Sequence, residues 1–255
     1  MLREPQGHSH RCSRSQHRTL RLQNSEFIVR PVLALGHADE ETVAMLKVGL
    51  TGGIACGKST VLEMFAARGA YVLRADLVAH QLMEPGQKLF EQVVSSFGRE
   101  ILGPDGRIER AKLAALAFPA NGQPARIQEL NAIVHPAVLA YEDDWMRDIG
   151  EADPGAVTLC EAALMIEAGG HHRYDRLIVV TCTEEQRVER FAQRSGLPLD
   201  AARAEVARRM AAQMPEQEKA RLADFVIDNS GTREELAAQV DRIWQELQVL
   251  AVKPR

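Results

Sequence analysis

A glycine-rich segment at residues 52–60 constrains the fold of this chain more than any other part of the sequence. It has the sequence GGIACGKST and matches the GxxxxGKS/T pattern of phosphate-binding loops in full. An apolar run at 46–50 precedes the segment and a helical pattern at 58–68 follows it, which is the strand–loop–helix context that the motif requires. We therefore predict a nucleotide phosphate site formed by Gly52, Gly53, Ala55, Cys56, Gly57, Lys58, Ser59 and Thr60.

The residue types in this loop suit an anionic ligand. Glycines allow positive φ angles and bring backbone N–H groups close to phosphate oxygens. The helix that begins near Gly57 directs its unpaired N–H groups and the positive end of its dipole at the same anion. Lys58 supplies a mobile charge for the β- and γ-phosphates, and Ser59 offers a hydroxyl group to Mg²⁺. We interpret Cys56 as a small side chain that fits the loop rather than as a redox-sensitive thiol.

After Met45 the chain alternates short apolar runs with helical patterns. This alternation predicts an α/β fold with a doubly wound parallel sheet of the P-loop NTPase type. The predicted strands cover residues 46–50, 70–73, 156–160, 177–181 and 225–228. The predicted helices cover residues 58–68, 77–83, 87–97, 123–147 (one helix, or two broken at Pro136), 184–195, 200–213, 215–222 and 232–248.

Composition and charge exclude several other classes of protein. The 255 residues include 31 Lys and Arg against 35 Asp and Glu, a net charge of −4, whereas nucleic-acid-binding domains normally show a basic excess. No apolar run approaches the roughly 18 residues of a membrane span. The 4 cysteines are scattered and form no CxxC pair, which argues against a zinc ribbon or a disulfide scaffold. These features indicate a cytoplasmic protein that binds neither nucleic acid nor membrane.

The first 44 residues differ from the remainder. They contain six Arg and no Lys, and residues 1–26 show little hydrophobic periodicity, so we expect disorder there. Two interpretations of this extension are open: a targeting peptide, or an upstream stretch that is not translated, with Met45 as the true initiator. We favour the second, because a compact strand begins directly after Met45. The phosphate-loop domain is expected to span residues 45–250.

Two acidic residues follow predicted strands, at the sheet edge where ligands bind in such folds. Asp76 is placed either to accept the proton of an attacking hydroxyl group or to cap the helix predicted at 77–83, and spacing alone favours the cap. Glu161 is placed either to hold Mg²⁺ through water or to lie in solvent as an ordinary loop acid, and both interpretations stay open.

Arginines gather on two later helices. Arg187, Arg190 and Arg194 share one face of the helix at 184–195, and Arg209 and Gln213 lie four residues apart in the region of the next helix. Helices in this position commonly form a lid whose guanidinium groups close over phosphates. The alternative is a solvated charged face, which the neighbouring acids favour for most of these arginines.

Histidines give weaker indications. His135 precedes Pro136 in a helical stretch, and a structural histidine at a proline kink is commoner than one that contacts an anionic substrate. His171 and His172 have no third ligand at a suitable spacing, so we predict no metal site there.

Taken in order, these segments resemble the dephospho-coenzyme A kinase family. The phosphate loop is generic, whereas the ordered set of blocks is specific and extends over roughly residues 46–248. The blocks that carry the resemblance lie at residues 48–60, 74–76 (RAD), 84–86 (EPG), 134–136 (VHP), 161–167 (EAALMIE), 209–213 (RMAAQ) and 223–231 (ADFVIDNSG).

The resemblance implies transfer of the ATP γ-phosphoryl group to the ribose 3′-hydroxyl of dephospho-coenzyme A. Mg²⁺ is expected at Ser59 from the loop chemistry, with Glu161 as a second candidate that would hold it through water. The resemblance also implies a nucleotide-binding core, a helical substrate-binding region and a lid. We expect a monomer or weak homo-oligomer. The catalytic residues implied are Asp76 as the base, Lys58, and Arg190 in the lid. Arg209 and Gln213 match the R-x-x-x-Q pattern of the next helix, and Asn229 lies where the family lines its adenine pocket.

Two departures from the family pattern stand out. The family usually has Asp-Ala-Asp where this chain has Arg74-Ala75-Asp76, and a proline is missing from the block at 161–167. Neither change removes a group that the mechanism requires, and Arg74 is in a position to alter substrate affinity. Two other functions are weighed: a kinase for another small acceptor such as a nucleoside monophosphate, and a nucleotide-dependent switch. Asp76 and the arginine helices disfavour the switch, which needs no acceptor-side base.

Overall fold

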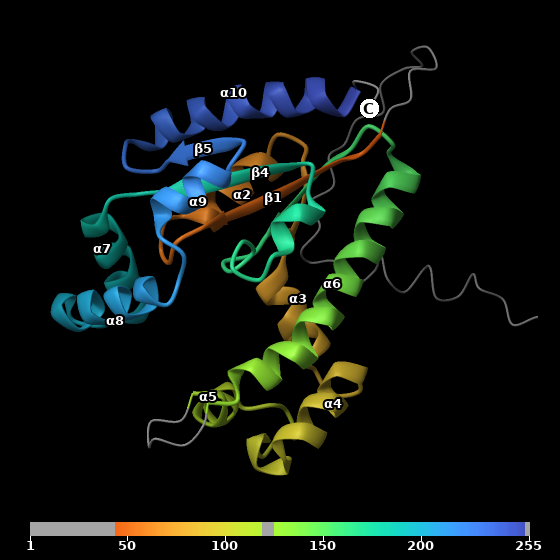
Figure 1. The fold of residues 1–255 in the computed structure, drawn as a ribbon, viewed down its shortest axis with the longest axis vertical. Helices are drawn as coiled ribbons and strands as arrows, with labels where there is room; N and C mark the ends of the chain where they lie inside the picture. Colours follow the sequence, from red (N-terminus) through yellow and green to blue (C-terminus); the bar gives the residue numbers. More distant parts are fainter. Residues whose placement is uncertain (1–43, 119–124, 253–255) are drawn as a thin grey trace, which may run out of the picture.

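The computed structural model describes residues 44–118 and 125–252, so the predicted extension lies outside the described residues except for Ala44. Within these residues, five parallel strands form one sheet in the order β2-β3-β1-β4-β5 (Figure 1). β1 is central, so the segment that follows it emerges between β3 and β4. The strands are β1 (Leu46–Gly52), β2 (Tyr71–Arg74), β3 (Val157–Glu161), β4 (Arg176–Thr181) and β5 (Phe225–Asp228).

Helices cover both faces of the sheet. The helices that do so are α2 (Lys58–Ala66), α3 (Ala75–Leu82), α6 (Ile127–Ala152) and α10 (Arg233–Val252). α2 and α10 pack on one face, through side chains such as Phe65 and Val240. α3 and α6 pack on the opposite face, through side chains such as Val78 and Trp145. The strands read as nearly continuous apolar runs because both of their faces are buried, as in β3, where every residue is buried.

Two further groups of helices extend from the sheet (Figure 1). One group is an arm that packs around its own apolar core, which includes Val93 and Phe97, against one end of α6. The other group follows β4 and packs around Val188 and Phe191. Their elements are α4 (Lys88–Phe97), η1 (Arg99–Ile101) and α5 (Arg110–Ala117) in the arm, and α7 (Glu184–Ser195) and α8 (Leu199–Ala211) in the second group. The short helix α9 (Glu216–Leu222) packs against β4. This arrangement confirms the predicted fold class.

α6 is a single helix of 26 residues that continues through Pro136. Proline removes one backbone hydrogen bond from a helix interior. Packing against α3 and α4 compensates for that loss here, so the continuous alternative for this stretch is the correct one. No helix in the described part of the chain is long and apolar enough to span a membrane.

Candidate active site

The segment after β1 forms a tight loop that leads into α2. Gly57 has φ 95°, a backbone conformation that favours glycine, and a Cβ at this position would lie 2.1 Å from Asn229 Nδ2. Gly52, the first glycine of the motif, has φ 153°, and a Cβ there would lie 2.4 Å from the backbone carbonyl oxygen of Val180. Lys58, at the start of α2, donates hydrogen bonds from Nζ to two carbonyl oxygens of the loop at 3.1 and 3.0 Å. The motif glycines are therefore required by close contacts on both sides of the loop.

Buried side chains hold the phosphate loop from behind. Asn229 Nδ2 donates a hydrogen bond to the carbonyl oxygen of Cys56 at 2.8 Å, and Arg187 Nη1 donates one to that of Ile54 at 2.8 Å. Arg187 also forms an ion pair with Glu216 at the start of α9. These hydrogen bonds and the ion pair thus connect the loop to α7, to α9 and to the segment after β5.

The environments of Cys56 and Asn229 give each side chain a structural role. Burial raises the pKa of the Cys56 thiol, although Lys58 and Arg187 oppose that rise. A neutral, fully buried thiol supports the interpretation of Cys56 as a side chain that simply fits. The amide of Asn229 is engaged with the loop, and its contact with adenine stays a prediction.

The acids that follow β2 and β3 face the same end of the loop. Asp76 lies in the first turn of α3 with its side chain 61% exposed, and Glu161 is 8% exposed at the end of β3. Burial raises the pKa of Glu161, while Lys58, Arg74 and a hydrogen bond with Ser59 lower it. Glu161 is therefore a buried acid beside the motif serine, so the solvated-loop interpretation is wrong.

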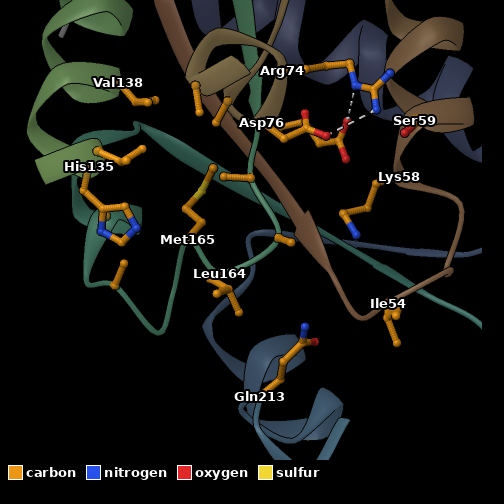
Figure 2. A pocket seen from close by; sticks show the side chains of 18 of the residues that line it. Ile54, Lys58, Ser59, Arg74, Asp76, His135, Val138, Leu164, Met165 and Gln213 are labelled. Carbon is orange, nitrogen blue, oxygen red and sulfur yellow. Dashed lines mark ion pairs between the residues drawn. The ribbon is translucent and has the colours of Figure 1, made fainter. Parts of the chain in front are cut away.

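A cavity of about 950 Å³ lies over the phosphate loop, a volume that suits a nucleotide-sized ligand. Figure 2 shows Lys58, Ser59 and Asp76 on one side of it and His135 and Met165 on the other. Its lining includes the predicted site residues Ala55, Gly57, Lys58, Ser59, Thr60, Asp76, Glu161, Arg190 and Arg209. The lining does not include the predicted residues Gly52, Gly53, Cys56 and Asn229.

Arginines from α7 and α8 reach this cavity. Arg190, Arg194 and Arg209 line it together with Gln213. Arg190 Nη1 donates a hydrogen bond to the carbonyl oxygen of Cys56 at 3.4 Å, which places the guanidinium at the phosphate loop. Arg187 is only 1% exposed, so the solvated-face interpretation is wrong for that residue.

The apolar side of the cavity was not predicted from the sequence. It is formed by α6 and by the segment between β3 and β4. The helical spacing of Leu130, Val134 and Val138 is the signal that indicates a shared face of α6. These side chains, with Leu164 and Met165, give the cavity an apolar wall opposite the charged residues.

Glu142 is a buried acid in the wall of this cavity that sequence reasoning missed. It lies on α6, is 2% exposed and accepts a hydrogen bond from the Tyr174 hydroxyl at 3.2 Å. Burial raises the pKa of Glu142 to about 7, although Tyr174 and Arg173 act in the opposite direction.

We expect this acid to make stability depend on pH. Between the unfolded pKa of 4.5 and the folded pKa of about 7, the folded state keeps a proton that the unfolded state has released, so stability falls as the pH rises. The loss is at most about 3 kcal/mol. Glu142→Gln never ionises and still accepts the Tyr174 hydrogen bond, so its melting temperature should fall less between about pH 5 and pH 8. Glu91→Gln, at an exposed position of α4, is the control. The prediction would be contradicted if the melting temperatures of the native protein and both variants changed with pH in the same way.

Comparisons with known proteins agree with this geometry. A family model described as dephospho-CoA kinase matches residues 46–235. The chain belongs to the dephospho-CoA kinase family. Proteins named dephospho-CoA kinase from Thermobifida fusca and Methylococcus capsulatus are 41% and 42% identical to it, over 80% and 81% of this chain and 97% and 99% of theirs. A crystal structure of a Thermus thermophilus protein is similar with a TM-score of 0.64 and 32% identity, over 80% of this chain and 98% of that one.

Membership in the dephospho-CoA kinase family confirms the resemblance that the ordered sequence blocks predicted. The matched residues 46–235 include the whole sheet, the arm and the helices α7, α8 and α9. The dephospho-CoA kinase match concerns the family and not single side chains. The roles of Asp76, Arg190, Arg209 and Asn229 therefore stay predictions.

Proposed function

We propose that this protein transfers the γ-phosphoryl group of ATP to the ribose 3′-hydroxyl of dephospho-coenzyme A, giving coenzyme A and ADP in the final step of coenzyme A synthesis. Membership in the family supports this activity. The observation that carries it is that Asp76 shares one cavity with Lys58 and Ser59. An acceptor hydroxyl beside the acid then faces the phosphates on the loop, as in-line transfer requires.

Each of these residues has a definite task in that reaction. The loop amides and Lys58 bind the phosphates of ATP, and Asp76 orients the acceptor hydroxyl and accepts its proton. Arg190 and Arg209, from the lid helices, neutralise charge that develops on the phosphates. Closure of these helices excludes water, which prevents simple hydrolysis of ATP. The apolar wall of the cavity accommodates the remainder of the acceptor.

The residues present fit a magnesium ion. Mg²⁺ prefers oxygen ligands, and the Ser59 hydroxyl and the Glu161 carboxylate lie together at the start of α2. Among the described residues, the buried Glu161 Oε2 has an ion pair with Arg74 but no hydrogen bond, so a cation or its water would share this oxygen with the guanidinium. When bound with the nucleotide, Mg²⁺ neutralises phosphate charge.

The catalytic unit that we propose is residues 45–250. The family match supports the start of this unit, since it begins at residue 46 and extends to residue 235, and the described structure supports its end, since α10 continues to Val252. We further propose a cytoplasmic enzyme that acts as a monomer or weak homo-oligomer.

A coupled assay of ADP release tests the function directly. With ATP and Mg²⁺ present, adding dephospho-coenzyme A should start rapid ADP release, and the product should carry the new phosphate on the ribose 3′-oxygen. A panel of nucleoside monophosphates should give no comparable release. Faster release with a nucleoside monophosphate would point to a different acceptor. Tight nucleotide binding with slow hydrolysis and no acceptor response would favour the switch.

A further inference from the structure

Arg74 lies between the two acids of the site. It is the last residue of β2, where it is paired in register with Glu161 of β3, and it occupies the N-cap position of α3. Its Nε lies 3.3 Å from Glu161 Oε2, and its Nη2 lies 3.7 Å from Asp76 Oδ2 (Figure 2). One guanidinium group therefore bridges the acid assigned to the metal and the acid assigned to the acceptor hydroxyl.

This bridge is electrostatic rather than a saturated hydrogen-bond pair. Arg74 Nε and Glu161 Oε2 are both buried atoms without a hydrogen-bond partner among the described residues, although they lie within ion-pair distance. A buried carboxylate requires a nearby cation, because its loss of solvation is otherwise uncompensated. Arg74 and Lys58 supply that charge to Glu161. Arg74 is about one-third exposed at the cavity wall, which leaves its outer nitrogens room to move.

We infer that Arg74 is a positioning residue that holds Asp76 and Glu161 at a fixed separation and competes with the divalent cation for the Glu161 carboxylate. This inference rests on the proposed function, since it concerns the metal and the acceptor acid of that reaction. Asp76 is otherwise exposed, and its Oδ1 accepts a hydrogen bond from the backbone N–H of the adjacent Leu77 at 3.0 Å. Arg74 therefore provides the link between Asp76 and the sheet on the metal side.

Two effects of opposite sign follow from removing this charge. Without the guanidinium, Glu161 faces a metal with one fewer competing cation, so the metal should bind more tightly. Without the bridge, Asp76 loses a constraint on its orientation, so turnover should fall, because misplacement of a reacting group is costly. If Arg74 only stabilised the fold, its removal would not tighten metal binding while lowering turnover.

The experiment compares Mn²⁺ binding with turnover in full-length protein. Free Mn²⁺ is measured by electron paramagnetic resonance in the presence of saturating ADP, and kcat is measured with ATP, Mg²⁺ and dephospho-coenzyme A. Arg74→Gln should bind Mn²⁺ about 3- to 10-fold more tightly, and its kcat should be about 10-fold lower. Arg147→Gln is the matched control, because it removes the same charge from an exposed position of α6 and should leave both quantities unchanged.

Arg74→Lys separates charge from bridging. Lysine keeps the charge but cannot span both acids, so its Mn²⁺ affinity should stay near that of the native protein while its kcat falls several-fold. Unchanged or weaker Mn²⁺ binding by Arg74→Gln would overturn the competition, and an unchanged kcat in Arg74→Lys would overturn the positioning role. Should Arg74→Gln fail to fold, Arg74→Lys decides the positioning role, and Arg74→Met, which also lacks the charge, replaces Arg74→Gln in the Mn²⁺ measurement. The Mn²⁺ measurement needs only ADP, so a native protein inactive toward dephospho-coenzyme A would refute the proposed function without deciding this inference.

Discussion

Asp76→Asn is expected to lower kcat about 10²-fold or more while leaving ATP affinity nearly intact. Asparagine has the shape of aspartate but cannot take the proton of the acceptor hydroxyl. Asp76 lies in the first turn of α3, and among the described residues it forms no hydrogen bond or ion pair with the loop at residues 52–60. Coupled ADP release measures turnover, and calorimetric titration with ADP measures nucleotide affinity.

The matched control for this change is Asp148→Asn. Asp148 lies on α6 outside the cavity lining, and the variant removes the same charge with the same change in shape. It should retain native turnover. Native turnover by Asp76→Asn with dephospho-coenzyme A would show that Asp76 is not the base.

Lys58→Met should lower kcat about 10²- to 10³-fold, the range found when one preorganised donor to a transition-state charge is lost. Methionine keeps most of the apolar stem, so the packing at the start of α2 changes little. Nζ now donates to two loop carbonyl oxygens, and transfer of this group to the phosphates contributes to both binding and catalysis. Unlike Asp76→Asn, this variant should also lose affinity for ATP and ADP.

Comparison of the two variants separates the nucleotide side of the site from the acceptor side. Lys88→Met, at an exposed position at the start of α4, is the control for loss of a lysine. The same pair of assays applies. If Lys58→Met keeps native ADP affinity and turnover, the phosphates do not lie where the loop geometry places them.

Local signals predicted several elements correctly. The predicted helix at 184–195 and strand at 225–228 have the observed bounds of α7 and β5. The bounds of α7 follow from its ends: Thr183 Oγ1 accepts a hydrogen bond from Gln186 N, and Gly196 has φ 67°. Such caps act within a few residues, so they are visible in the sequence.

Other elements depend on packing that the sequence does not display. α5 has 8 residues and buries only Leu113 and Ala117, so its periodic signal is weak, and no helix was predicted there. α3 begins at Ala75 and has Arg74 at its N-cap, so Asp76 is not the cap that spacing favoured. A shift of two residues in a helix start is thus enough to change the role expected of a side chain.

The supporting residues of the site could not be predicted because their partners are distant in the chain. Arg187 pairs with Glu216, 29 residues later, and Glu142 meets Tyr174 across 32 residues. Without those partners, an arginine on a charged helix and an acid on a polar stretch are expected to lie in solvent. The phosphate motif, by contrast, contains all its chemistry within one loop.

The hydrogen bonds from Asn229 and Arg187 hold the phosphate loop in its binding conformation before a nucleotide arrives. A receptor that is already arranged loses little affinity to reorganisation when a ligand arrives. The backbone N–H groups of the loop would bind the β-phosphate of ADP as well as that of ATP. We therefore expect ADP to compete with ATP for this loop.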